Sequence, residues 1–198
     1  AWPYADRTPT EQFRSVNSLP RDISLFTVGE DIYASATPSE EVSSLRTSTA
    51  EIETFLVDNA ASKDVAVGGY DAYEVSFTLK PQFEGKTKVT LCNACGEKFS
   101  LEFDTENMTV LADRSESGKM TRIKSFVLMP AAPLGLCNSS DGYDVDVFVD
   151  KCSVEVFVDG GRIAMTNLVF PSESFDNIVF ESTGESEISN MFIHKIGK

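Results

Sequence analysis

Residues 143–171 read YDVDVFVDKCSVEVFVDGGRIAMTNLVFP, and this stretch decides the fold. Valines occupy every second position over 145–149 and again over 154–158, and one acidic residue and one phenylalanine stand between the valines of each run. A period of two is typical of a strand with one buried face. Residues 159–161, Asp-Gly-Gly, supply the positive φ that a tight hairpin turn needs. A third run begins at Arg162 and stops at Pro171, so the stretch predicts an antiparallel meander in an all-β domain.

The register of the first hairpin follows from its charges. A two-residue loop at 150–151 would place Asp146 directly opposite Glu155, and like charges that face each other across a strand pair are unfavourable. A four-residue loop over 150–153 puts Asp146 beside Phe157 instead. It also pairs the valines with one another, Val149 with Val154 and Val147 with Val156. We therefore predict the longer loop.

Strand-like runs recur along the rest of the 198 residues. They stand about 8 to 12 residues apart with turn signals between them, a spacing that indicates a β-sandwich or barrel. One helical turn is expected at 39–45 with Ser39 as its cap. Residues 38–49 otherwise look turn-like, and 113–118 look like a loop. The expected strands outside the meander are 19–28, 31–37, 51–58, 70–79, 88–91, 97–103, 108–112, 177–181 and 186–196.

The charge of the chain excludes some partners. With 17 basic and 31 acidic residues the formal net charge is −14. Phosphate binding needs clustered Lys and Arg, so nucleic acid and anionic membrane surfaces are disfavoured. No run of about 18 apolar residues predicts a membrane span. Residues 1–4, AWPY, lack the basic and apolar regions of a signal peptide.

The cysteines and the single histidine do not form a metal-binding pattern. Cys92 and Cys95 make a lone C-x-x-C, and a zinc site needs a second pair of ligands at suitable spacing. The only histidine, His194, lies far from that pair in the sequence. We expect no metal and no cofactor, and we interpret Cys92, Cys95 and Cys137 as structural. Cys152 shares the phase of the valines and is expected to be a small core residue.

No catalytic residue is expected in this chain. A serine or cysteine nucleophile usually needs a histidine base, and no Gly-x-Ser-x-Gly elbow is present. Two carboxylates are enough for glycoside hydrolysis, and Asp146 and Glu155 are the candidates in the meander. Acidic residues that alternate with valines on strands, however, usually form the solvent face. We therefore expect Glu155 to point outward, away from any active site.

Three segments together resemble a known family. FRSVNSLPRDISL at 13–25, TVLADRSESG at 109–118 and VFVDKCSVEVFVDGGRIAMTNLVFP from Phe148 onward stand in the order and spacing seen in the C-terminal module of glycoside hydrolase family 32. That family includes levanases, inulinases and invertases. The resemblance covers nearly the whole chain. Cys152 stands where serine is commoner, and Asp-Gly-Gly at 159–161 stands where Asn-Asp-Gly is usual.

The resemblance implies a fold and a division of the chain. It implies a two-sheet antiparallel β-sandwich, a lectin-like jelly roll related to the concanavalin type, that follows a five-bladed catalytic propeller. None of the acidic motifs of that propeller is present, so no catalytic residue can be assigned by resemblance. Residues 1–18 would be the linker and a remnant of the last propeller strand, and 19–198 a single sandwich domain. Trp2, Tyr4 and Phe13 are then candidate interface residues to the propeller.

Three functions follow as hypotheses. The first is a non-catalytic support module of a β-fructofuranosidase or levanase that acts on fructans or sucrose, with homo-oligomer formation as a further role. The second is a lectin-like carbohydrate-binding module for fructans, because fold alone does not decide function. The third is an autonomous enzyme that uses surface carboxylates. By resemblance alone, the expected location is extracellular or periplasmic.

Overall fold

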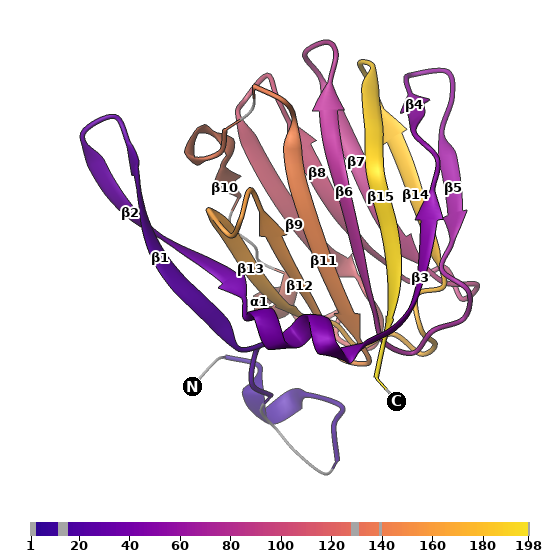
Figure 1. Cartoon of the computed structure of the whole chain (residues 1–198). Coiled ribbons are helices and arrows are strands. Elements are labelled where there is room, and N and C mark those ends of the chain that lie inside the picture. Colours follow the sequence, from indigo (N-terminus) through magenta and orange to yellow (C-terminus); the bar gives the residue numbers. More distant parts are fainter. Residues whose placement is uncertain (1–2, 12–15, 128–130, 139, 198) are drawn as a thin grey trace.

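The computed structural model describes residues 3–11, 16–127, 131–138 and 140–197. Within them, two antiparallel sheets pack face to face, which confirms the expected β-sandwich (Figure 1). One sheet runs in the order β13-β12-β11-β6-β15-β3, with β4 also paired to β15, and the other runs β10-β9-β8-β7-β14-β5. The first comprises β3 (Arg46–Ile52), β4 (Phe55–Val57), β6 (Tyr73–Pro81), β11 (Tyr143–Asp150), β12 (Ser153–Val158), β13 (Ile163–Leu168) and β15 (Ser186–Ile196). The second comprises β5 (Lys63–Ala66), β7 (Lys86–Cys92), β8 (Lys98–Asp104), β9 (Thr109–Glu116), β10 (Ala132–Pro133) and β14 (Asn177–Ser182).

The meander has the predicted register. Val149 pairs with Val154, Val147 with Val156, and Asp146 with Phe157. Asp150 and Ser153 form one further pair, so only residues 151–152 turn the chain. Three successive residues at 159–161 adopt positive φ and close the second hairpin.

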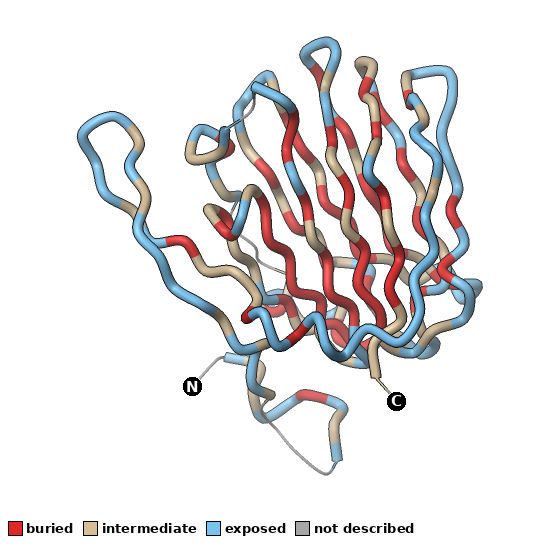
Figure 2. The backbone as a smooth tube through the Cα atoms, in the orientation of Figure 1, coloured by how far each residue is buried: buried red, intermediate tan, exposed pale blue. Residues whose placement is uncertain are grey.

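The core lies between the two sheets. Buried residues recur along the strands of both sheets (Figure 2). Their apolar members form one continuous cluster. Aromatic rings meet edge to face within it, as between Phe77 and Phe180, whose centroids lie 5.5 Å apart. Burial of such side chains is the main favourable contribution to folding. The meander valines belong to this cluster, in agreement with the period of two in the sequence.

Strands β1 (Arg21–Val28) and β2 (Asp31–Pro38) join neither sheet of the sandwich. They pair only with each other among the described residues and project from the side of the molecule (Figure 1). Their anchor is at the base, where the Ala36 amide donates to the carbonyl of Gly161 at 3.0 Å. A Cβ at 161 would collide with the Ala36 carbonyl, and the φ of 72° also favours glycine.

Short helical segments complete the described chain. They are η1 (Ala5–Arg7), η2 (Glu40–Leu45), α1 (Lys124–Val127) and η3 (Leu134–Leu136). The turn η2 confirms the helical turn expected at 39–45. Ser39 does not cap it through its side chain, however, because its hydroxyl makes no capping hydrogen bond.

Several secondary-structure predictions were wrong in polar segments, which were expected to be turns or loops but form strands. Residues 46–49 were expected in a turn, yet they belong to β3, an edge strand with an almost fully exposed burial pattern. Residues 113–116 were expected in a loop, yet β9 runs to Glu116. The single strand expected at 51–58 is divided between β3 and β4, and β5 was not foreseen. Pairing with a neighbouring strand, rather than any local pattern, determines these elements.

Candidate functional site

Two sequence segments that lie far apart meet on the outer face of the seven-stranded sheet. Arg21, at the start of β1, donates from Nη2 to Glu155 Oε2 on β12 at 2.5 Å. The backbone amide of Leu19 donates to the other oxygen, Oε1, at 2.7 Å. The Glu155 side chain is only 5% exposed. Both carboxylate oxygens are therefore held by donors from residues 19–21, which cover Glu155.

This arrangement corrects one expectation about Glu155. The residue does lie on the outer face of its sheet, but it is buried there rather than solvent-exposed. The guanidinium of Arg21 also stacks 5.0 Å from the ring centroid of Phe157, which is buried beside Val42 and Phe148. A carboxylate covered in this way has no room for substrate. Glu155 thus fastens residues 19–21, at the start of β1, to the sandwich.

A second ion cluster lies on the same face. Arg46 on β3 makes a bidentate pair with Glu74 on β6, from Nε at 2.6 Å and from Nη2 at 2.5 Å. The Glu74 side chain is 1% exposed. Hydrogen bonding to Glu74 raises the pKa of Arg46, although burial works against it. The fork geometry matches the carboxylate and holds the edge strand β3 to the centre of the sheet.

Asp146 lies in the same cluster, and no donor in the described part of the chain forms a hydrogen bond with its carboxylate. Burial, and then the negative charge of Glu74, raise the pKa of Asp146 to about 6. Asp146, Arg46 and Glu74 line a cavity of about 270 Å³, and residues 37–40, Val42 and Gly161 are also part of its lining. Glu155 is not among the residues that line this cavity. The two carboxylates considered for glycoside hydrolysis therefore do not share an open site.

The Asp-Arg-Ser-x-Ser-Gly segment forms a buried junction rather than a loop site. Arg114 is 8% exposed and donates from Nε to the Phe126 carbonyl at 2.8 Å. Its guanidinium stacks 4.3 Å from the Phe126 ring centroid. Ser117 donates to the Arg114 carbonyl at 2.8 Å, and a Cβ at Gly118 would collide with the Phe170 carbonyl. The segment joins β9 to the chain beyond β13.

Of the three candidate interface residues, only Tyr4 lies in the described part of the chain; Trp2 and Phe13 lie outside it. The Tyr4 ring packs edge to face on Phe126 with centroids 5.3 Å apart. Arg114 donates from Nη2 to the Tyr4 hydroxyl at 3.3 Å. Tyr4 is thus half-buried against the sandwich and keeps part of its surface open.

The four cysteines are free thiols. Burial raises the pKa of each of them, and that of Cys137 rises to about 12. A thiol that stays protonated is a poor nucleophile and a poor metal ligand. Cys152 is not the valine-face core residue that we expected. It lies in the turn and packs, half-buried, beside Met120, Phe126 and Phe170, because only two residues turn the chain there.

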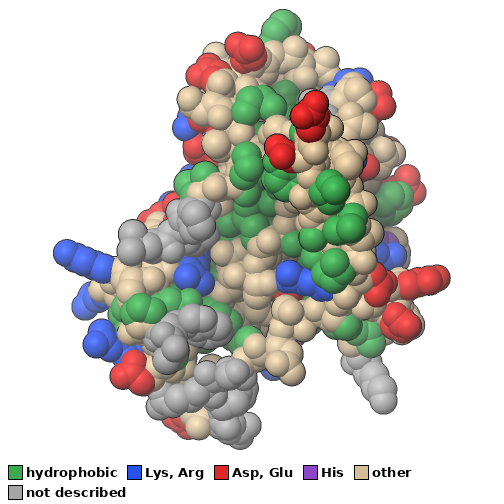
Figure 3. All heavy atoms as spheres, turned by 90° about the vertical axis from the view of Figure 1, so that its left-hand side faces the viewer, with side chains coloured by type: hydrophobic (Ala, Val, Ile, Leu, Met, Phe, Trp, Pro, Cys, Tyr) green, Lys and Arg blue, Asp and Glu red, His purple; other side chains and the backbone are tan. Residues whose placement is uncertain are grey.

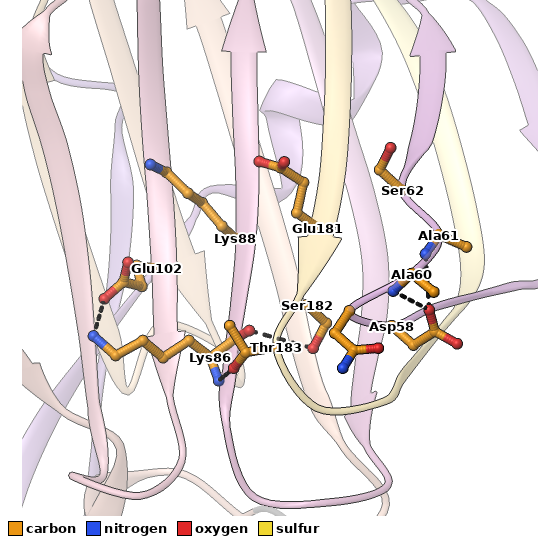
Figure 4. Close-up of a pocket in the computed structure, with 11 residues that line it drawn as sticks. Asp58, Ala60, Ala61, Ser62, Lys86, Lys88, Glu102, Glu181, Ser182 and Thr183 are labelled. Atoms are coloured by element: carbon orange, nitrogen blue, oxygen red, sulfur yellow. Dashed lines mark hydrogen bonds and ion pairs between the residues drawn. The ribbon is translucent and has the colours of Figure 1, made fainter.

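A polar cleft runs along the outer face of the six-stranded sheet (Figure 4). It encloses about 450 Å³ and is lined by residues 58–62 together with Lys86, Lys88, Glu102, Glu181, Ser182 and Thr183. Lys86 Nζ lies 2.7 Å from Glu102 Oε1. Lys88 and Glu181 face each other across β7 and β14. The lining offers many hydroxyl-binding groups and no aromatic ring.

The described residues offer no metal centre. No group of three or more His, Cys, Asp or Glu side chains lies close enough there to hold an ion. His194 Nδ1 is 2.8 Å from the hydroxyl of Thr49, and burial lowers its pKa. It therefore serves as a neutral partner on the sheet surface.

Comparison with known proteins gives a consistent result. A family model described as "Glycosyl hydrolases family 32 C terminal" matches residues 41–195. A levanase from Bacillus subtilis (strain 168) is 27% identical over 201 residues, which cover 100% of this chain and 29% of the levanase. An extracellular exo-inulinase from Aspergillus awamori is 26% identical over 187 residues, which cover 92% of this chain and 34% of the inulinase.

Solved structures agree with this assignment of the fold. The crystal structure of exo-inulinase from Aspergillus awamori superposes with a TM-score of 0.79 at 25% identity and covers 100% of this chain and 39% of that one. A β-fructofuranosidase from Schwanniomyces occidentalis superposes with a TM-score of 0.79 at 21% identity, a likeness of fold. The chain spans about a third of the length of the levanase and the exo-inulinase that it matches. Among its described residues, no helix is long and apolar enough to cross a membrane.

Proposed function

The chain belongs to the C-terminal domain family of glycoside hydrolase family 32, and from that premise we propose that it is the non-catalytic module of a fructan- or sucrose-cleaving hydrolase. The observation that carries the proposal is coverage: relatives named levanase and exo-inulinase align over nearly all of this chain, and yet the chain accounts for only 29% and 34% of them. The chemistry of the parent would then reside in the part that precedes this chain.

The residues that identify the family support a structural role. The charged groups of these residues form contacts within the module: Arg21 pairs with Glu155, and Arg114 donates to the Phe126 carbonyl. None of the three lines the polar cleft of Figure 4 or the cavity at Asp146. A module built in this way braces its neighbour rather than performing chemistry.

We further propose that residues 1–18 are the linker and a remnant of the last propeller strand, and that 19–198 form one sandwich domain. Trp2, Tyr4 and Phe13 would then contribute to the surface that meets the catalytic propeller. The open part of the Tyr4 ring supports this idea, because its other side already packs on the sandwich. The relatives named extracellular inulinases support an extracellular location for the parent.

The test compares two proteins, the full-length gene product and this 198-residue chain. Both are incubated with levan, inulin and sucrose, and fructose release is measured. We expect release only by the full-length protein. Fructose release by the 198-residue chain, abolished by Glu155→Gln, would overturn the proposal and favour an autonomous enzyme.

The polar cleft of Figure 4 favours fructan binding as a second candidate. Its carboxylate, amide and ammonium groups suit sugar hydroxyls, although the missing aromatic ring removes the usual stacking surface. Calorimetric titration with levan, inulin and short fructo-oligosaccharides tests it directly. Absence of heat at millimolar ligand would exclude a lectin-like role, and Glu181→Ala should abolish any heat that is seen.

A further inference from the structure

The β1–β2 hairpin presents an apolar face to solvent. Strand pairing places three residues of β1, Ile23, Leu25 and Thr27, directly opposite three residues of β2, Ala36, Ala34 and Ile32. Directly paired residues share one face of an antiparallel ribbon. These six residues form the outer hairpin face and carry no charge, in a protein whose net charge is −14. Arg21 follows on the same side at the base of the hairpin, where it is paired with Glu155.

The exposure of this face is unusual within the molecule. Ile23 is 67% exposed, Leu25 74% and Ile32 68%. They make up three of the seven large apolar side chains that the described part of the chain exposes. Figure 3 turns this side of the molecule towards the viewer and shows apolar side chains gathered along it.

The opposite face of the hairpin already has its contacts. Phe26 and Tyr33 stack with ring centroids 5.6 Å apart, and Arg162 lies 4.7 Å from the Phe26 ring centroid. The Arg21–Glu155 pair and the Ala36–Gly161 hydrogen bond tie down the base. A two-stranded ribbon is only marginally stable in water unless a face is covered. The hairpin is therefore oriented by the sandwich and open on its outer side.

We propose that the outer hairpin face is the docking surface for the catalytic region that precedes this chain in its relatives. This inference rests on the proposed function. The family match describes a C-terminal part, so the remaining two-thirds of the relatives lie on the N-terminal side. The hairpin starts at Arg21, directly after the N-terminal segment, and residues 3–11 lie below its base (Figure 1).

Connectivity and charge favour this occupant over a second copy of the chain. A region joined through a short linker meets the hairpin at millimolar effective concentration, so a modest apolar contact suffices. A second copy also has a net charge of −14, so the two chains would repel each other when they come into contact. The uncharged face thus suits an apolar patch on the adjoining region.

Hydrogen exchange tests the proposal without requiring activity. Amide exchange over residues 21–38 is measured in the full-length gene product and in the 198-residue chain. Docking should slow exchange in the full-length protein by about 10-fold or more, because local opening must then break the contact. Equal exchange in the two proteins overturns the proposal, and so does a gene that encodes no upstream region.

Matched variants locate the contact. Leu25→Lys with Ile32→Lys should abolish the extra protection, whereas Leu56→Lys with Phe83→Lys, at 57% and 68% exposure elsewhere, should leave it intact. Light scattering on the 198-residue chain adds an independent check. A dimer that the hairpin variant converts to monomer would show that a second copy occupies the face and would overturn the proposal. Fructose release by the full-length protein tests the proposed function separately. The proposed function and the docking of the hairpin can therefore be refuted independently of each other.

Discussion

Removal of the Arg21 side chain should destabilise the domain by leaving a carboxylate buried without its counter-ion. The Glu155 side chain is 5% exposed and that of Arg21 is 20% exposed. Loss of one partner of a fully buried ion pair costs roughly 3–5 kcal/mol. Glu155 keeps the Leu19 amide, and it also keeps the Thr166 hydroxyl at 3.4 Å, so the expected cost of Arg21→Ala is smaller, about 2–3 kcal/mol.

That cost translates into a measurable shift. For a domain of this size 1 kcal/mol corresponds to about 2–4 °C in the melting temperature, so Arg21→Ala should lower it by roughly 4–12 °C. Arg21→Lys keeps the charge and should recover about half of the loss. Differential scanning calorimetry and urea unfolding at pH 7 supply the two measurements.

The matched control is the exposed pair of Lys98 and Glu116, which lie 2.8 Å apart with side chains 41% and 61% exposed. Lys98→Ala should cost no more than about 0.5 kcal/mol. If Arg21→Ala and Lys98→Ala lower the melting temperature equally, Glu155 does not depend on Arg21, and the fastening role assigned to the pair is wrong.

Three further perturbations follow from the fold. Val156→Ala, at a site with 0% exposure, should destabilise by about 2 kcal/mol in urea unfolding through lost burial and a cavity, and an unchanged midpoint would contradict its place in the core. Gly161→Ala should release the hairpin and speed amide exchange over 31–38, because the new Cβ meets the Ala36 carbonyl, whereas Gly160→Ala has open space and should change that exchange little. Asp146 has its pKa raised to about 6, so the folded state binds more protons than the unfolded state between about pH 4 and 6, and this residue makes stability fall as pH rises through that window. Asp146→Asn should remove that slope and raise the free energy of unfolding at pH 7 by on the order of 1–3 kcal/mol; an unaltered pH profile would refute the assignment.

The motifs that identify the family act as fasteners between distant parts of the chain. Arg21, the first residue of β1, holds Glu155 of the meander, and Arg114 holds Phe126 and contacts Tyr4. The glycine that ends the Asp-Arg-Ser-x-Ser-Gly segment lets Phe170 approach the backbone closely. The most recognisable sequence motifs of this module therefore hold distant parts of the chain together.

Prediction from the sequence was most reliable where local chemistry is decisive. The meander register followed from the charges of Asp146 and Glu155, and the structure confirmed it. Prediction failed at β3, where an exposed polar edge strand shows no alternation. It also failed for Cys152, because this residue is one of the two that turn the chain between β11 and β12 and therefore does not lie on the inward face of a strand.

The sequence by itself determined the all-β class, the strand faces on which the valines lie, and the family. The reason is that residue alternation and turn chemistry involve only a few neighbouring residues, so they can be recognised directly in the sequence. The burial of Glu155 and the open cavity at Asp146 were decided only by the tertiary structure. So was the outward apolar face of the hairpin. Each of these depends on which distant segment covers a strand face, and a period of two separates the two faces without saying what lies against either of them.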